Sequence, residues 1–212
     1  MAKCTVNTIY DSIEACPGKT VLSGLRRRIY YQSKSNIVTM PKLPSLEGED
    51  KPADMAALAT LVGDFKLKAE EYWHYIDLKD NASNVSYETA GEEGSQIIQN
   101  TVKAIVAGSG KDITGFAREV KNDDMVYVYQ EREGDFRVIG NDMFTTNTKP
   151  SGDTGAEATA AKTTTFEITC YDSCPAPYYE GKLVLSETEQ LDCATGEITA
   201  DAAPAGGGTA GT

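Results

Sequence analysis

The stretch that most constrains the fold covers residues 125–140 and reads MVYVYQEREGDFRVIG. Its valines alternate with a methionine and two tyrosines, and a charged segment around Gly134 separates this run from a second apolar run. Alternation with a period of two is typical of a β-strand that presents two different surfaces. A glycine supplies the positive φ that a tight turn needs. The stretch therefore predicts a β-hairpin.

A short helix is predicted immediately before this hairpin. Asp112 can cap its N-terminus. Apolar residues then follow at spacings of three and four, which places them on one face of a helix. These residues are Ile113, Phe116, Ala117 and Val120. We expect the helix and the hairpin to nucleate the core.

Most of the other elements are predicted to be strands. Residues 65–78 are interpreted as one long strand with aromatic side chains on both faces, and residues 84–107 as a long hairpin with an acidic, glycine-bounded tip. A hairpin of that length could extend beyond a small domain, and its exposed edges would need cover from another subunit. Shorter strands are expected as two runs within 21–40, then at 163–171 and 178–185.

Four segments are expected outside the sheets. They are a proline-rich acidic connection at 41–52, a short helix at 53–62 that Gly63 ends, a mobile loop at 145–161 and a flexible tail at 201–212. We predict a single domain over residues 1–200, with its core at about 21–187.

Charge narrows the possible partners. The chain of 212 residues has 20 basic and 32 acidic side chains and a net charge of −12. Such a surface repels nucleic-acid phosphates and anionic membranes, which argues against a sequence-specific DNA-binding protein. A protein that lets DNA pass without retaining it is still compatible with this charge.

The N-terminus lacks the apolar run of a secretory signal, and no window has the roughly 20 apolar residues of a membrane span. We expect the protein to fold in a cytosol.

The sequence contains no recognisable catalytic motif. Residues 108–111 read GSGK but lack the earlier glycine and the following Ser or Thr of a phosphate-binding loop. His74 is the only histidine, and we interpret it as a packed or surface residue. The five cysteines are interpreted as reduced structural thiols, ahead of a disulfide or a metal site. We predict a protein that is not an enzyme and has no cofactor and no metal.

Two groups of residues are candidates for subunit contacts. Arg26, Arg27 and Arg28 form either a solvated, ion-paired edge or a surface that meets acidic groups on a neighbour. Aromatic residues on both faces of the 65–78 segment indicate either a sandwich interior or a packed subunit interface. The aromatic candidates are Tyr72, Trp73 and Tyr75.

The order of elements resembles that of the major tail tube proteins of tailed bacteriophages, particularly those found with hosts of the Bacteroidetes type. The likeness covers about residues 25–185. It follows a helix with an acidic turn, the MVYV strand, the charged hairpin, RVIGN at 137–141, a variable loop and the strand TTFEITC at 164–170. It implies a mainly β fold, a β-sandwich or barrel with a flanking α-helix and a long projecting hairpin.

The resemblance also implies a function. Tail tube subunits close into rings, usually hexameric, which stack into a hollow tube that conducts DNA. The chain would be a structural protein of the virion tail, assembled in the host bacterial cytoplasm. Its partners would be other copies of itself and the tape-measure, terminator and baseplate proteins, with DNA met only in passing and no membrane. The candidate lumen-facing acids are Glu88, Glu92 and Glu93.

Two other interpretations remain. The nearer is a different phage morphogenesis component, such as a tail terminator, a head-completion protein or a capsid decoration protein. The farther is a soluble ligand-binding β-sandwich or enzyme whose site has no motif in the sequence.

Overall fold

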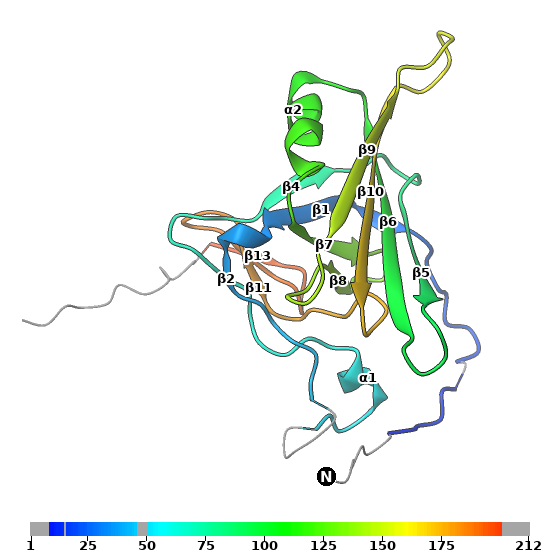
Figure 1. Ribbon diagram of the computed structural model, residues 1–212, viewed down its shortest axis with the longest axis vertical. Coiled ribbons are helices and arrows are strands. Elements are labelled where there is room, and N and C mark those ends of the chain that lie inside the picture. The colour runs from blue at the N-terminus through cyan, green and yellow to red at the C-terminus, as the bar shows by residue number, and fades with distance from the viewer. Residues whose placement is uncertain (1–8, 15, 46–50, 201–212) are drawn as a thin grey trace, which may run out of the picture.

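The computed structural model describes residues 9–14, 16–45 and 51–200, and it confirms a mainly β chain with the character of a sandwich. One four-stranded sheet, the first sheet, has the order β4 (His74–Asp77), β1 (Leu25–Ser33), β7 (Met125–Glu131), β8 (Phe136–Ile139). The second sheet has the order β5 (Asn84–Ala90), β6 (Ile97–Ala107), β10 (Thr163–Asp172), β9 (Asn147–Asp153). In Figure 1 the strands of the second sheet run along the long axis and cross those of the first.

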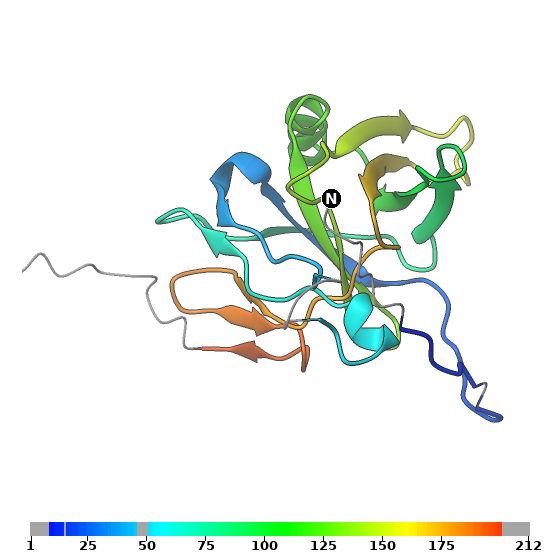
Figure 2. The ribbon, with the colours of Figure 1, turned by 60° about the horizontal axis from the view of Figure 1, so that its bottom comes forward.

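Smaller elements surround these two sheets. A three-stranded sheet has the order β11 (Lys182–Val184), β12 (Gln190–Asp192), β13 (Ile198–Thr199), and β2 (Ile37–Thr39) pairs with β3 (Lys66–Leu67). The helices are α1 (Met55–Leu58), α2 (Lys111–Val120) and the 3-10 turn η1 (Lys34–Asn36). Figure 2 shows the small sheet on the side of the molecule opposite the second sheet.

Strand β7 is buried on both faces and separates two apolar clusters. Tyr127 and Tyr129 belong to the cluster between the first and second sheets. Val126 and Val128 point the other way, into a cluster with Trp73 and residues of the small sheet. The predicted hairpin is confirmed, with β7 paired to β8 across a turn in which Gly134 has φ +120°.

Helix α2 covers the first of these clusters. The predicted apolar stripe is confirmed, because Val120 is buried and the other three members pack against the cluster. The Phe116 ring lies 5.2 Å from that of Phe166 on β10 and 4.7 Å from that of Tyr31 on β1. The predicted cap is wrong, because Gly110 occupies the N-cap position and Asp112 lies in the first turn. A carboxylate there still interacts favourably with the helix dipole.

The prediction of one long strand at 65–78 is wrong. The segment divides into β3 and β4 because the chain turns between them at Glu70, whose φ is +64°. Aromatic residues occupy both faces because Trp73 points into the core while Tyr75 lies half exposed at the surface. The helix predicted at 53–62 is also shorter, because residues beyond α1 form β-bridges to Tyr178 and Lys42.

The segment predicted as a mobile loop at 145–161 instead contains strand β9. It pairs with β10 along its whole length, although it contains Pro150 and no large apolar residue. Proline is tolerated on an edge strand, where its missing N–H points away from the sheet. Thr148 is buried, and its hydroxyl lies 2.8 Å from that of Tyr127. Pairing and a polar core contact, not apolar burial, hold this strand.

The hairpin predicted at 84–107 is present as β5 and β6, but it is not a free arm. Strand β10 covers the other edge of β6, and three β6 side chains are buried in the core. Only the tip at 91–96 extends past the pairing with β10.

Near the C-terminal end of the described chain, Leu191 and Cys193 are buried, so the packed chain extends past the predicted limit at 187. The tail at 201–212 lies outside the described residues.

The double burial of β7 leads to a matched pair of stability predictions. Val128 is fully buried, so Val128→Ala should lower the free energy of unfolding by about 2 kcal/mol through lost burial and a residual cavity. Val38 is 66% exposed, so Val38→Ala should change it by less than about 0.5 kcal/mol. Urea unfolding followed by circular dichroism measures both. Equal effects would contradict the assignment of β7 to the centre of the core.

Burial also makes stability depend on alkaline pH. It raises the pKa of the Tyr127, Tyr129 and Tyr179 phenols above 10.0, and that of the Cys174 thiol from 9.0 to about 11. The folded state keeps these protons when the unfolded chain has lost them, so the free energy of unfolding should fall as pH rises above 9. Each such group contributes at most about 1.4 kcal/mol per pH unit.

The variant Tyr127→Phe should flatten this dependence between pH 10 and 11 by about three quarters of one group's share, because the unfolded phenol is half ionised at pH 10. The lost hydroxyl contact should cost about 1 kcal/mol near neutral pH. Urea unfolding at each pH provides the comparison. An unchanged slope would mean that the Tyr127 phenol ionises in the folded protein.

Candidate assembly surfaces

The arginine triplet lies at the start of β1, between Leu25 and Ile29, which both contact the first cluster. Arg28 donates to the Asp77 carboxylate on β4 at 2.9 Å, which raises the pKa of the guanidinium above its ordinary value. The same guanidinium lies 3.7 Å from the centre of the Tyr75 ring. Two candidate contact residues that the sequence places far apart, Arg28 and Tyr75, therefore meet on neighbouring strands.

The other arginines of this region are less firmly held. Arg27 forms an ion pair with Asp80 at 2.9 Å, but the two side chains are 76% and 55% exposed. Exposed ion pairs contribute little to stability, so this one can exchange partners. Arg132, from the charged turn between β7 and β8, donates to the Asn81 side chain. The Arg26 guanidinium forms no hydrogen bond or ion pair with any other described residue.

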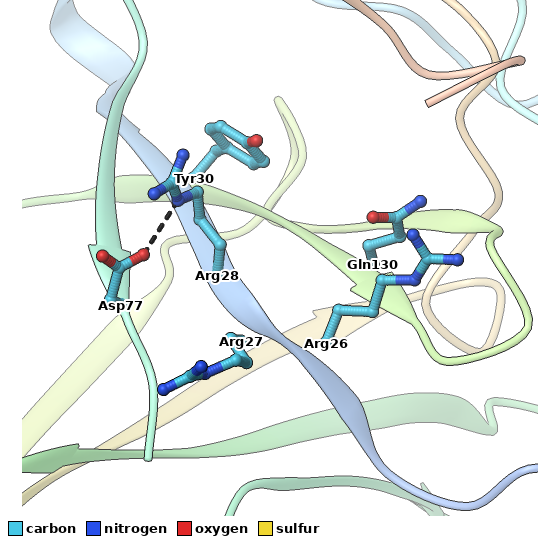
Figure 3. Close-up of a pocket in the computed structure, with 6 residues that line it drawn as sticks. All are labelled: Arg26, Arg27, Arg28, Tyr30, Asp77 and Gln130. Atoms are coloured by element: carbon cyan, nitrogen blue, oxygen red, sulfur yellow. Dashed lines mark hydrogen bonds and ion pairs between the residues drawn. The ribbon is translucent and has the colours of Figure 1, made fainter. Parts of the chain in front are cut away.

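A hollow of about 470 Å³ opens among these side chains. It is lined by Arg26, Arg27, Arg28, Tyr30, Asp77 and Gln130. Figure 3 shows Arg28 beside Asp77 and Arg26 extended toward Gln130 on β7. We call this group the arginine hollow, and Arg132 lines the adjoining surface. The sequence did not single out Arg132, because it lies more than a hundred residues from the triplet, in a turn that looks like ordinary surface.

The three aromatic candidates differ in exposure, because Trp73 is buried, Tyr72 is partly buried and Tyr75 is exposed. Trp73 is 2% exposed and packs edge-to-face on Phe65, so its side chain belongs to the chain's own core. The Tyr72 carbonyl accepts a hydrogen bond from Gln32 at 2.7 Å, which ties this segment to β1. Tyr75 is the one member of the three with a half-exposed ring.

The three candidate acids lie on the second sheet. Glu88 is on β5 and exposed, whereas Glu92 and Glu93 lie in the turn between β5 and β6 and are also exposed. No other described residue forms an ion pair with their carboxylates. These negative charges are therefore available to a partner.

Strand β5 forms an open edge of the second sheet. The Gly108 N–H donates to the Lys162 carbonyl at 2.9 Å, which shows that even-numbered residues of β6 bond toward β10 and odd-numbered residues toward β5. Glu88 is paired with Gln99 and therefore bonds to β6, as do the other even-numbered residues of β5.

By the same alternation, Val85, Tyr87 and Thr89 point their backbone N–H and C=O groups outward. No described residue hydrogen-bonds to these groups. The strand carries neither lysine nor proline, the residues that commonly protect an edge from pairing with another chain. The opposite edge, β9, differs because it carries Lys149 and Pro150.

The face of the second sheet that points away from the core is polar. Its eleven β6 and β10 positions alternate with the buried ones and include four threonines and charges of both signs, with Ile97, Ile105 and Tyr171 as the large apolar exceptions. The charged residues of this face are Glu88, Lys103, Lys149, Asp153 and Glu167. The face is therefore hydrophilic with charges that nearly balance.

An extended segment before β1 also leaves apolar side chains in solvent. Residues 9–14 and 16–24 contain no helix or strand, and Figure 2 shows much of this segment reaching away from the body of the molecule. Its four large exposed hydrophobic residues are Tyr10, Ile13, Val21 and Leu22. Apolar side chains in such an arm are typical of a segment that packs on a partner.

The thiols and the histidine show no site geometry. Cys170 and Cys193 are buried, and burial raises the pKa of both thiols. His74 lies on the surface with its ring 5.6 Å from that of Tyr31. Among the described residues, no three His, Cys, Asp or Glu side chains gather as metal ligands, and no helix has the length and apolar character to cross a membrane.

The open β5 edge gives a prediction that separates backbone from side chain. Thr89→Pro removes an outward N–H and leaves the bonds to β6, whereas Thr89→Ala keeps that N–H. If the edge pairs with another copy, the proline variant should raise the concentration needed for half-assembly by about tenfold, and the alanine variant should not. Sedimentation velocity measures this value. Equal behaviour of both variants would show that the edge is not an interface.

Comparisons of the chain with protein-family models, with curated proteins and with solved structures give no match.

Proposed function

We propose that this chain is the repeating structural subunit of a phage tail tube, which self-associates into rings that stack into a hollow conduit for DNA. The observation that carries this proposal is the second sheet. Its two edges are open and chemically different, one of its faces is packed on the core, and its other face is polar.

The edges favour a closed ring. An isolated antiparallel sheet with free edges is prone to pair with further strands. Because β5 and β9 differ, the edge of one copy can join the opposite edge of the next in a heterologous contact, and such contacts close into a ring when the rotation between copies is right. Each copy then adds four strands to a continuous barrel.

The faces of the sheet fix which side would line such a barrel. Helix α2 and the first sheet cover the face that carries Val102 and Phe166, so only the polar face is free to line the interior. That face carries Glu88, in keeping with its candidacy as a lumen residue, and also the opposite charge of Lys103. A lumen with nearly balanced charge holds few phosphates, so DNA would pass without being retained.

The resemblance to tail tube proteins supplies the wider setting of this proposal. It implies a subunit that is assembled in the bacterial cytoplasm into the virion tail, with tape-measure, terminator and baseplate proteins as further partners. The exposed apolar arm before β1 supports an obligate association, because a lone chain would leave these side chains in water.

Electron microscopy of the purified protein in negative stain, together with sedimentation velocity, tests the proposal. We expect long hollow rods whose abundance rises with protein concentration. Isolated rings that never stack would instead favour a terminator or head-completion protein. A monomer that persists over a wide range of concentrations would exclude both assembly functions and favour a soluble binding protein.

A further inference from the structure

We propose that the arginine hollow receives the carboxylates of Glu92 and Glu93 from a second copy of the chain, so that copies join head to tail. This contact rests on the proposed function and specifies how successive rings of the tube would hold together. Four observations support it: surplus charge in the hollow, unpaired carboxylates in the tip, the rigid form of the tip, and the location of both at opposite ends of β6.

The arginine hollow and its rim carry more positive charge than their own carboxylates neutralise. Four guanidinium groups, those of Arg26, Arg27, Arg28 and Arg132, face two carboxylates, those of Asp77 and Asp80, which leaves a surplus of two. Glu133, beside Arg132, accepts a hydrogen bond from the Leu22 N–H at 3.1 Å. That hydrogen bond leaves the carboxylate charged, so Glu133 lowers the surplus at the rim to one, and the region stays positive.

The guanidinium group suits this partner. Its planar set of donors can bind a carboxylate through two parallel hydrogen bonds. Arg26 has all of these donors free of other described residues, and Figure 3 shows its guanidinium beside Gln130, on the far side of β1 from Asp77. An incoming carboxylate can therefore bind the Arg26 guanidinium without breaking an existing hydrogen bond or ion pair of that side chain.

The tip that carries the two glutamates is held in one shape. Gly91 has φ +94°, and a Cβ at that position would lie 2.8 Å from the Ser95 carbonyl oxygen, so the turn requires glycine there. The Ser95 N–H closes the turn by donating to the Glu92 carbonyl at 3.0 Å. A fixed turn presents its carboxylates with little ordering cost on binding.

The hollow and the tip cannot meet within one copy. Arg27 lines a surface together with Val106 and Ala107, at the last residues of β6, whereas the tip precedes Ile97, the first residue of that strand. An eleven-residue strand separates the two by on the order of 30 Å. Complementary groups at opposite ends of one strand join successive copies along a line.

A phosphate could also bind guanidinium groups, so DNA is the main competitor for this surface. The net charge of −12 works against a phosphate polymer, which must approach the whole molecule. A tip from another copy arrives with the rest of its interface, which compensates for that repulsion. The observations therefore favour the carboxylate.

Charge reversal in both partners tests the contact. One variant carries Arg26→Glu and Arg132→Glu, which break no ion pair among the described residues, and a second carries Glu92→Lys and Glu93→Lys. Each should raise the concentration needed for half-assembly by about tenfold or more. A third variant with all four changes restores opposite charges and should assemble nearly as well as the unaltered chain. Sedimentation velocity and negative-stain microscopy measure all three.

A matched control reverses two exposed charges elsewhere, Arg118→Glu on α2 and Glu157→Lys in the loop after β9, and should assemble normally. Circular dichroism and the urea midpoint confirm that each variant is folded. If the four-change variant assembles no better than expected from adding the two double variants, or if either double variant assembles normally, the contact is wrong.

The remaining outcomes separate this contact from the proposed function. An unaltered chain that stays monomeric overturns both, whereas one that forms rods regardless of these reversals overturns the contact alone. Fluorescence anisotropy with a labelled DNA duplex at physiological salt should show no binding. Binding that the Arg26 and Arg132 reversal abolishes would assign the hollow to phosphates and overturn the carboxylate contact.

Discussion

The burial of β7 on both faces is the constraint on which the rest of the structure depends. Tyr127 and Tyr129 face the second sheet and α2, while Val126 and Val128 face Trp73 and the small sheet. A strand with no solvent-exposed face requires a separate layer packed on each of its two faces. The order of the chain follows from this need, because one layer comes largely from residues 85–117 and 166–176, and the other from residues 30–73 and 179–193.

Much of the fold can be predicted from hydrophobic periodicity, and the elements that were predicted wrongly lack that signal. Helix α2, the β7–β8 hairpin, the β5–β6 pair and β10 bury apolar side chains at regular spacing, so their sequences predict them. Strand β9 has no such signal, because pairing with β10 holds it. The break at Glu70 depends on a backbone conformation that a glutamate rarely adopts, and no residue pattern marks it.

Only part of the candidate surfaces could be predicted from the sequence, because local residue patterns mark some of them and tertiary contacts define the others. A run of three arginines is visible in any sequence, and so is an acidic turn between glycines. Tertiary pairing decides the rest: which acids neutralise the arginines, that Arg132 joins them, and that Trp73 points inward. The open β5 edge is invisible in the sequence, because an edge is defined by the strand that is missing beside it.

The separation of the arginine hollow from the glutamate tip by the length of β6 gives any linear assembly of this chain a polarity. One terminus of the rod would present unfilled arginine hollows, and the other would present uncovered carboxylate turns. A factor that nucleates growth and a factor that caps it would therefore need opposite charges, and neither could take the other's place. The orientation of β6 in each subunit would therefore set the direction in which the rod grows.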